Sequence, residues 1–205
     1  MSTILVVDYN TGNVGSVIKA LNLFETNVIF SKNHHDLDQC SKIILPGQGS
    51  YDHAMKELKK LNFVEKIKKK VSRENIPILG ICLGMQILSD YGYENNKKTS
   101  GLGLISGEVK LITNKPQPLP NIGWRTVNIK KKNKILNNIK NNRDFYFIHS
   151  YKFLTKNKKN ILAESFYNEF FTSAVCEEKI FGMQFHPEKS LKDGIKILEN
   201  FIKLK

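Results

Sequence analysis

The sequence predicts an α/β fold in which a mostly parallel sheet is covered by helices and extended by antiparallel strands. Two observations carry this prediction. In the first half, short apolar segments alternate with segments whose apolar residues recur at helical spacing, which is the pattern of βαβ units around a parallel sheet. In the second half, short strand-like segments follow one another between turns rich in Asn, Lys and Pro, which is typical of antiparallel hairpins.

The length and composition are those of one globular domain. The chain has 205 residues, 40% hydrophobic and 25% charged, which is enough for one sizeable core and short for two. We therefore expect a single domain over residues 1–205. No apolar run approaches the roughly 20 residues that span a bilayer, and residues 3–8 read as a strand rather than a signal peptide. The three cysteines form no CxxC pair, so we expect no disulfide framework, no metal site and a cytoplasmic location.

The elements of the first half follow from their hydrophobic patterns. Apolar runs predict strands, and apolar side chains three and four residues apart predict helical faces. The expected elements are strands at residues 4–8, 26–30, 42–45 and 78–81, and helical segments at residues 14–24 and 55–63.

The second half is expected to be mostly strands. They are residues 102–105, 107–112, 125–130, 145–148, 161–164, 171–176 and 180–184. A final helix is predicted to begin near Ser190, because apolar side chains recur at helical spacing from Leu191 to Ile202.

The stretch around Cys82 has the form of a nucleophile elbow. The motif Gly80-x-Cys82-x-Gly84 begins within the predicted strand, which ends at Ile81. Its glycines leave room for a sharp strand-to-helix turn. The start of the following helix and the Leu83 amide would favour a thiolate and an adjacent oxyanion. The alternative is a structural cysteine on a Gly-rich turn, because free Cys is often simply buried. A base elsewhere in the chain decides between them.

His186 is the candidate base. His34, His35 and His53 lie in polar surroundings and are expected at the surface, whereas His186 follows the last strand directly. The carboxyl ends of parallel strands gather at one edge of a sheet, so Cys82 and His186 should meet there. Glu188, held by the intervening Pro187, can orient the imidazole, which gives a Cys–His–Glu triad. A lone His-Pro-Glu is more often a plain turn, so this interpretation depends on the elbow.

These two motifs together resemble the class I, triad-type glutamine amidotransferases. Residues 80–86 and 184–188 carry that resemblance, and residues 46–49 resemble the family's oxyanion loop. Within the class, the chain resembles the glutaminase subunits of imidazole glycerol phosphate synthases over nearly its whole length. The segments that do so are Asp8-Tyr9, Gly12-Asn13, Gly123-Trp124, residues 146–151 and residues 186–190. The resemblance implies a flavodoxin-like, three-layer class I amidotransferase fold.

The resemblance also implies roles for individual residues. Cys82, His186 and Glu188 would be catalytic, releasing ammonia and glutamate from L-glutamine through a thioester. The expected oxyanion donors lie at Gly47, Gln48 and Leu83. The expected glutamine-binding residues are Gly49, Gln86, Glu94, Ser150 and Tyr151. For Glu94 the alternative is a loop carboxylate, since residues 93–96 read as a plain turn.

The family passes ammonia to a partner, which for this subfamily is a (β/α)8-barrel cyclase. The resemblance therefore implies a heterodimer that makes imidazole glycerol phosphate and an aminoimidazole carboxamide ribonucleotide in histidine biosynthesis, with no metal or organic cofactor. Asn13, Trp124, Tyr146 and Lys189 match interface positions. Trp124 is the only tryptophan, and a solitary Trp can equally belong to a core.

Two departures from the subfamily pattern concern the partner. The family usually has His-Met-Gly-Trp-Asn where this chain has residues 121–125, Asn-Ile-Gly-Trp-Arg, and usually has Val where it has Gln48. Gln48 would act through its backbone, so the glutaminase chemistry should survive. The substitutions near Trp124 favour an alternative in which a paralogous subunit supplies ammonia to a sugar-aminating enzyme of surface-glycan biosynthesis.

Other function classes are weighed against this one. The net charge of +13 could serve nucleic acid, but the basic runs at residues 66–70, 130–134 and 156–159 are scattered and lack interleaved aromatics. We expect a solvated surface, or steering of an anionic partner, and no nucleic-acid or membrane binding. An inactive binding module would not need the triad residues, and a cysteine protease would not explain Gln86 or residues 147–151.

Overall fold

The computed structural model describes residues 2–12, 14–113 and 116–204. A nine-stranded sheet forms its centre, in the order β2-β1-β3-β4-β13-β12-β11-β8-β9. Strands β2, β1, β3, β4 and β13 are parallel neighbours, and the remaining strands pair antiparallel. This is the mixed α/β sheet that the sequence predicts. The parallel strands are β1 (Thr3–Val7), β2 (Asn27–Ser31), β3 (Lys42–Leu45), β4 (Ile78–Ile81) and β13 (Ile180–Met183).

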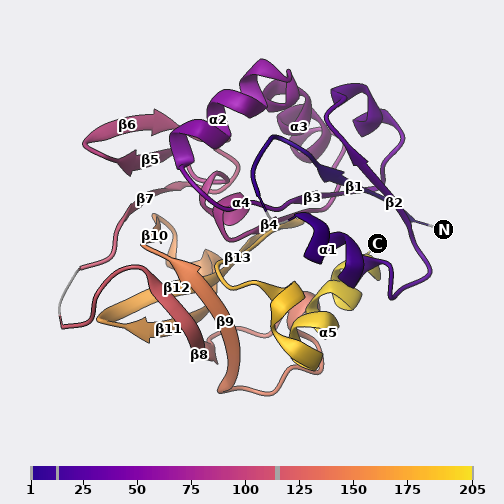
Figure 1. Cartoon of the computed structure of the whole chain (residues 1–205). Helices are drawn as coiled ribbons and strands as arrows, with labels where there is room; N and C mark the ends of the chain where they lie inside the picture. Colours follow the sequence, from indigo (N-terminus) through magenta and orange to yellow (C-terminus); the bar gives the residue numbers. More distant parts are fainter. Residues whose placement is uncertain (1, 13, 114–115, 205) are drawn as a thin grey trace.

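Helices cover both faces of the parallel part of the sheet. Figure 1 shows α2 (Tyr51–Lys60) and α3 (Phe63–Ser72) on one side, and α1 (Val14–Leu21) and α5 (Leu191–Ile202) on the other. The strands alternate their side chains between two apolar cores. Ile4 and Val6 enter the core beneath α1 and α5, whereas Leu5 and Val7 enter the core beneath α2 and α3. Burial on both faces explains why these strands are continuous apolar runs.

The antiparallel half consists of β8 (Asn121–Ile129), β9 (Arg143–His149), β11 (Ile161–Tyr167) and β12 (Glu169–Glu177). β9, β11 and β12 each contain a predicted strand and extend it. β8 begins four residues before the strand predicted at residues 125–130 and ends one residue before its end. β13 joins the two halves, because it pairs parallel with β4 and antiparallel with β12. The predicted C-terminal helix is confirmed as α5.

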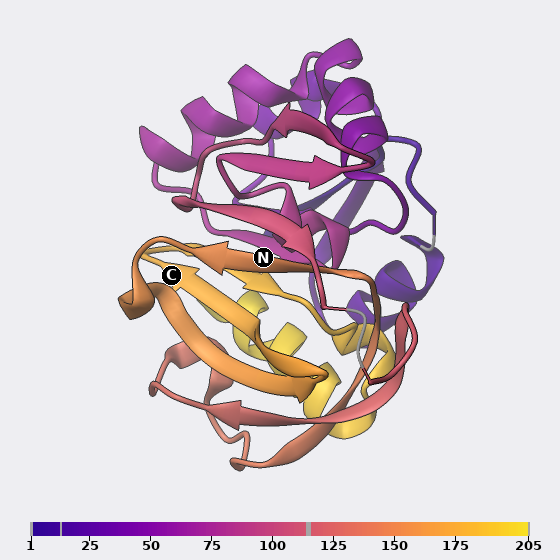
Figure 2. The same cartoon turned by 90° about the vertical axis from the view of Figure 1, so that its left-hand side faces the viewer.

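A second, four-stranded sheet was not foreseen. Its order is β10-β7-β5-β6, with strands β5 (Tyr91–Glu94), β6 (Lys97–Ser100), β7 (Gly107–Leu111) and β10 (Tyr151–Thr155). Figure 2 shows it between the α2–α3 layer and the antiparallel strands. Only β7 was predicted. Residues 93–96, interpreted as a plain turn, instead end β5 and begin the turn to β6, with Asn95 and Asn96 at positive φ.

The strand predicted at residues 102–105 is wrong. Leu102 and Ile105 are fully buried, as their apolar character implies. Their amides, however, donate to the carbonyls of Ile87 and Leu88 rather than to a neighbouring strand. The segment therefore supplies hydrogen-bond donors to the carbonyls that follow the short helix α4 (Leu83–Gln86). Carbonyls at a helix end would otherwise lack partners. The predicted helical segment at residues 55–63 is likewise divided into α2 and α3 at Asn62, whose φ is 59°.

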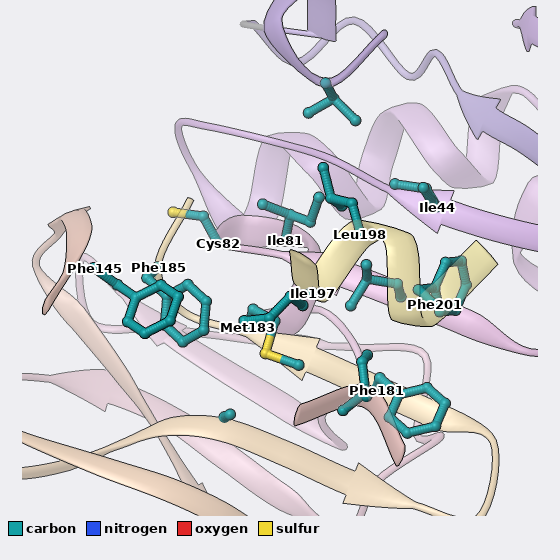
Figure 3. Close-up of a cluster of buried hydrophobic side chains, with 14 of the residues drawn as sticks. Ile44, Ile81, Cys82, Phe145, Phe181, Met183, Phe185, Ile197, Leu198 and Phe201 are labelled. Carbon is teal, nitrogen blue, oxygen red and sulfur yellow. The ribbon is translucent and has the colours of Figure 1, made fainter. Parts of the chain in front are cut away.

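Aromatic and aliphatic side chains lie directly behind the elbow. Figure 3 shows Cys82 at one end of this cluster, beside the rings of Phe145 and Phe185. These two rings are 4.3 Å apart between centroids. Because Phe185 precedes His186 in the chain, this packing fixes the backbone that carries the candidate base.

Candidate active site

Cys82 occupies a tight turn between β4 and α4. Its φ and ψ are 54° and −108°, and its amide donates to the Met183 carbonyl on β13 at 2.7 Å. A Cβ added at Gly80 would lie 2.4 Å from the Gly84 carbonyl oxygen, and one at Gly84 would lie 1.7 Å from that of Leu45. Both glycines are therefore required by close backbone approach. A non-glycine residue held at positive φ is typical of functional sites.

His186 and Glu188 form the base side of the site. The Nδ1 of His186 donates to Oε1 of Glu188 over 2.8 Å, and both side chains are buried. Burial by itself would lower the pKa of His186. The Cys82 sulfur and the Glu188 carboxylate outweigh it and raise that pKa to about 9, because both favour the charged imidazolium. The structure thus brings the three predicted catalytic residues together.

The backbone around His186 is also fixed. Its amide donates to the Tyr146 carbonyl at 2.9 Å. Ser190 Oγ donates to the His186 carbonyl at 2.6 Å and accepts from the Tyr146 amide at 3.0 Å. The base is consequently tied to strand β9, which carries the predicted interface residue Tyr146 and leads into the predicted substrate residues Ser150 and Tyr151.

A cavity of about 180 Å³ opens in front of the Cys82 sulfur. It gathers segments that are far apart in the sequence: the predicted oxyanion loop, the elbow and the residues after β9. Its lining residues are Gln48, Gly49, Cys82, Leu83, Gln86, Ile148, His149, Ser150 and Tyr151. Seven of these nine were predicted as site residues; Ile148 and His149 were not.

One predicted oxyanion donor, the Leu83 amide, is not free in this conformation. It donates to the Gly47 carbonyl at 3.3 Å, so its N–H is already hydrogen-bonded and is not available to an oxyanion in the cavity. The loop is held from behind, because the Tyr9 hydroxyl donates to the Pro46 carbonyl. Gly49 ends the loop at a φ of 109°, and a Cβ added there would meet nothing within 4 Å. An oxyanion hole made by Leu83 therefore requires rotation of the Gly47 peptide.

Glu94 lies beside the cavity rather than in its lining. Its Oε2 accepts from Ser50 Oγ at 2.7 Å and from the Tyr51 amide at 2.8 Å, which places a carboxylate at the start of α2. Its charge also contributes to the raised pKa of Tyr151, after burial of that side chain. Glu94 is thus near the Tyr151 wall of the cavity.

The predicted interface residues form an exposed cluster at the β8–β9 edge. Trp124 is 43% exposed and packs edge-to-face on Tyr146, its partner in the strand register, at 6.0 Å. Lys189 Nζ lies 5.8 Å from the centre of the Tyr146 ring. The solitary tryptophan therefore does not belong to the core. Asn13 lies outside the described residues.

Comparison with known families decides the class. A model of the family "Glutamine amidotransferase class-I" matches residues 5–204. The chain belongs to this family. It is 42% identical to imidazole glycerol phosphate synthase subunit HisH 2 of Methanococcus maripaludis over 98% of both chains. It is also 42% identical to subunit HisH of Pelagibacter ubique, over 98% of this chain and 99% of the relative.

Solved structures support the fold of this amidotransferase. PurLQS from Thermotoga maritima superposes with a TM-score of 0.77 at 19% identity, covering 98% of each chain. A second solved structure, of a glutamine amidotransferase, gives 0.76 at 17% identity, covering 97% of each chain. The predicted flavodoxin-like, three-layer amidotransferase fold is confirmed.

Two polar residues of this amidotransferase escaped sequence reasoning. Gln184 is fully buried, and its amide lies 3.7 Å from the Cys82 sulfur while its Oε1 accepts from Gln86 at 3.0 Å. His149 is buried in the cavity wall. Both belong to motifs that carry the family resemblance, and the signal that could have singled them out is a polar side chain at the end of an apolar strand.

Two further findings concern the whole amidotransferase. In the described part of the chain, no three His, Cys, Asp or Glu side chains are placed to hold a metal ion. None of the helices within the described ranges combines the length and apolar character needed to cross a membrane.

Proposed function

We propose that this chain hydrolyses L-glutamine to glutamate and ammonia as the glutaminase subunit of an imidazole glycerol phosphate synthase. The observation that carries the proposal is the meeting of Cys82, His186 and Glu188 at one small cavity, on a strained elbow whose glycines cannot be replaced. Cys82 must be a free thiol for this chemistry, and all three cysteines are unpaired, which fits a reducing cytoplasm.

The reaction follows from the atoms present. The Cys82 thiolate attacks the side-chain amide carbon of glutamine and forms a tetrahedral adduct. His186 then gives its Nε2 proton to the amide nitrogen, the C–N bond breaks, and ammonia leaves a thioester behind. His186, now neutral, takes a proton from water, whose oxygen attacks the thioester and releases glutamate. Glu188 holds the ring and stabilises its charged form throughout.

In the observed conformation of the oxyanion loop, catalysis first requires a rearrangement that frees the Leu83 amide. Donors aimed at a developing oxyanion typically contribute roughly 3 kcal/mol each, yet the Leu83 amide donates to the Gly47 carbonyl. We propose that rotation of this peptide frees Leu83 and turns the Gln48 amide inward. A partner that favours the rotated loop would activate the enzyme.

The remaining cavity groups would hold the amino-acid end of glutamine. Gln86 lines the cavity with Gly49 and the Ser150–Tyr151 backbone. Glu94, at the start of α2, would meet the α-ammonium group. Its present hydrogen bonds to Ser50 and Tyr51 use one carboxylate oxygen and leave the other for that contact.

The relatives' names supply the pathway. We propose a (β/α)8-barrel cyclase as partner, docked on Trp124, Tyr146 and Lys189, which would receive ammonia for histidine biosynthesis. Asn13 would belong to the same surface. The alternative, ammonia supply to a sugar-aminating enzyme, is favoured only by Asn121 and Arg125, which depart from the subfamily pattern next to Trp124. We propose no nucleic-acid or membrane role.

The deciding experiment measures glutamate release from glutamine by the chain alone, with the barrel cyclase, and with the cyclase and its ribonucleotide ligand. We expect strong stimulation only when both are present. If a folded chain whose Cys82 reacts with a glutamine-like chloroketone is not stimulated, the glutaminase chemistry stands and the proposed partner is wrong.

A further inference from the structure

Asn121 and His149 form a buried polar pair between the exposed β8–β9 edge and the glutamine cavity. They face each other in the register of β8 and β9. Asn121 is completely buried and His149 nearly so. The Asn121 Nδ2 lies 3.0 Å from the His149 Nε2. Buried polar groups of this kind hold one arrangement only when their hydrogen bonds agree.

The partners of the His149 ring fix its tautomer. Its Nδ1 lies 2.8 Å from the Tyr151 carbonyl oxygen, which can only accept, so Nδ1 carries the proton. The neutral ring then has a lone pair at Nε2, and the Asn121 amide is the donor that satisfies it. Among residues 2–12, 14–113 and 116–204, the Asn121 Oδ1 has no hydrogen-bond partner. Its side chain therefore acts on this ring alone.

The Tyr151 carbonyl connects the pair to the catalytic sulfur. It also accepts from Gln86 Nε2 at 3.0 Å. Gln86 Nε2 donates in turn to Gln184 Oε1 at 3.0 Å, and Gln184 Nε2 lies 3.7 Å from the Cys82 sulfur. A continuous series of contacts thus runs from β8 to the thiol. Each side chain in this series must keep one orientation to make its hydrogen bonds to both neighbours.

We propose that Asn121 is a positioning residue for glutamine binding, which acts by holding His149 as the neutral Nδ1–H tautomer and so fixing the Tyr151 carbonyl and Gln86. This inference rests on the proposed glutaminase function. It gives Asn121, which stands where the subfamily usually has His, a role in the substrate site of this chain.

The surroundings of His149 explain why a donor is needed there. The rings of Phe147 and Phe171 lie 5.6 and 4.9 Å from it between centroids. Burial lowers the pKa of His149 to about 4. The hydrogen bond to the Tyr151 carbonyl opposes this shift, and the charges of His186 and Arg125 add to it. A positive charge on His149 would oppose the imidazolium that His186 must carry during ammonia release.

Three variants test the proposal in the complex with the cyclase. Asn121→Leu removes the donor while keeping a side chain that branches at Cγ. Asn121→Asp replaces it with an acceptor, so His149 gains a second proton at Nε2 but still donates to Tyr151. Asn128→Leu is the matched control, since Asn128 lies exposed on the same strand and its side chain donates to Asn142 at 3.3 Å. The measurements are KM and kcat for glutamine and the ¹⁵N chemical shifts of the His149 ring.

We expect Asn121→Leu to raise KM by roughly tenfold, as loss of one buried hydrogen bond does, with kcat within about threefold of the wild type. Asn121→Asp should raise KM less, show both ring nitrogens protonated, and lower kcat, because a charged His149 opposes the His186 imidazolium. Unchanged KM and ring shifts in Asn121→Leu would overturn the proposal.

The ring measurement on the wild type decides if Asn121→Leu fails to fold. A proton on Nε2 instead of Nδ1 would overturn the proposal without any variant. Because this readout needs no turnover, a wild-type complex that fails to hydrolyse glutamine would count against the proposed function and not against the tautomer.

Discussion

The two sides of the glutamine cavity differ in how completely they are built. On the base side, the Cys82 amide donates to β13, the His186 amide donates to β9, and the His186 ring donates to Glu188. On the oxyanion side, the Gly47 carbonyl occupies the Leu83 amide, and the loop ends in a glycine at positive φ. The proposed nucleophile and base are in place, and the Leu83 amide that would stabilise the oxyanion is not.

Under the proposed mechanism, this difference places control on the oxyanion side of the cavity. A thiol and a base can be kept permanently assembled without hydrolysing glutamine quickly, provided that the oxyanion donors are withheld. Rotating one peptide changes few contacts, so we expect a modest binding energy from a partner to shift the loop. Substitutions on the base side are expected to lower the rate of glutamine hydrolysis. Substitutions on the loop side are expected to change how strongly the partner stimulates that rate.

Removing the nucleophile should give the largest effect. We expect Cys82→Ala and Cys82→Ser to reduce glutamine hydrolysis by about 10⁴-fold or more, while circular dichroism and partner binding stay unchanged. Cys176→Ala, at another buried free cysteine, should retain activity. Normal turnover by Cys82→Ala would contradict the mechanism.

Glu188→Gln should weaken the base side next. Its carboxylate stabilises the imidazolium, so the amide lowers the His186 pKa from about 9. The alkaline fall of kcat/KM should then begin at a lower pH, with kcat reduced by about 10²-fold.

The same raised pKa makes a prediction for folding. In the wild type, the stabilising contribution of charged His186 is fully present below pH 6.5 and is lost as pH rises through 9. Glu188→Gln should flatten this part of the stability curve. Glu164→Gln, at a surface pair with Lys130, should leave the pH dependence of both kcat/KM and stability unchanged. If kcat/KM of Glu188→Gln falls at the same alkaline pH as that of the wild type, the Glu188 carboxylate does not orient His186.

Tyr9→Phe tests the loop side. It removes the hydroxyl that donates to the Pro46 carbonyl and should favour loop rotation by about 1 kcal/mol. We expect glutamate release by the chain alone to rise about fivefold, with correspondingly smaller stimulation by the partner. Tyr51→Phe, which removes another buried tyrosine hydroxyl at Ser89, is the control. A lower melting temperature without a change in basal activity would mean that Tyr9 only supports the fold.

The smallest effect concerns strain at the elbow. Glycine usually destabilises a protein relative to alanine, but residue 82 sits at a φ of 54°. Cys82→Gly should therefore be more stable than Cys82→Ala by about 1 kcal/mol in urea unfolding. The same pair at Cys176 in β12 should show the ordinary order, with alanine the more stable. An ordinary order at position 82 would mean that the elbow stores no strain.

The parallel strands and the triad could be predicted because their signals are local. Continuous apolar runs specify doubly covered strands, and glycines two residues either side of Cys82 mark a crowded turn. The second sheet could not be predicted in the same way. β5 and β6 contain Gly92 and neighbouring lysines, and they are strands because Glu94, Tyr51 and α2 hold them in place. Tertiary contacts decided their conformation rather than intrinsic propensity.

The same distinction applies within the site. Cys82, His186 and Glu188 lie in short motifs, whereas His149 and Gln184 depend on contacts across 28 and 102 residues of sequence. The conformation of the Gly47 peptide has no sequence signal, because glycine permits both orientations. The strand predicted at residues 102–105 was wrong because an apolar run indicates burial, which Leu102 and Ile105 show, but does not specify the hydrogen-bond partners of the backbone.

The central position of β13 has a consequence for biosynthesis of the chain. This strand is made from residues 180–183 but inserts between β4 and β12, and it supplies the carbonyl that holds Cys82. A nascent chain on the ribosome cannot close its sheet until these residues have emerged, so folding is late and dominated by distant contacts. Chains that end before residue 186 carry the thiol without its proposed base, and we expect them to release no ammonia. Synthesis through β13 and His186 is therefore required before this activity can begin.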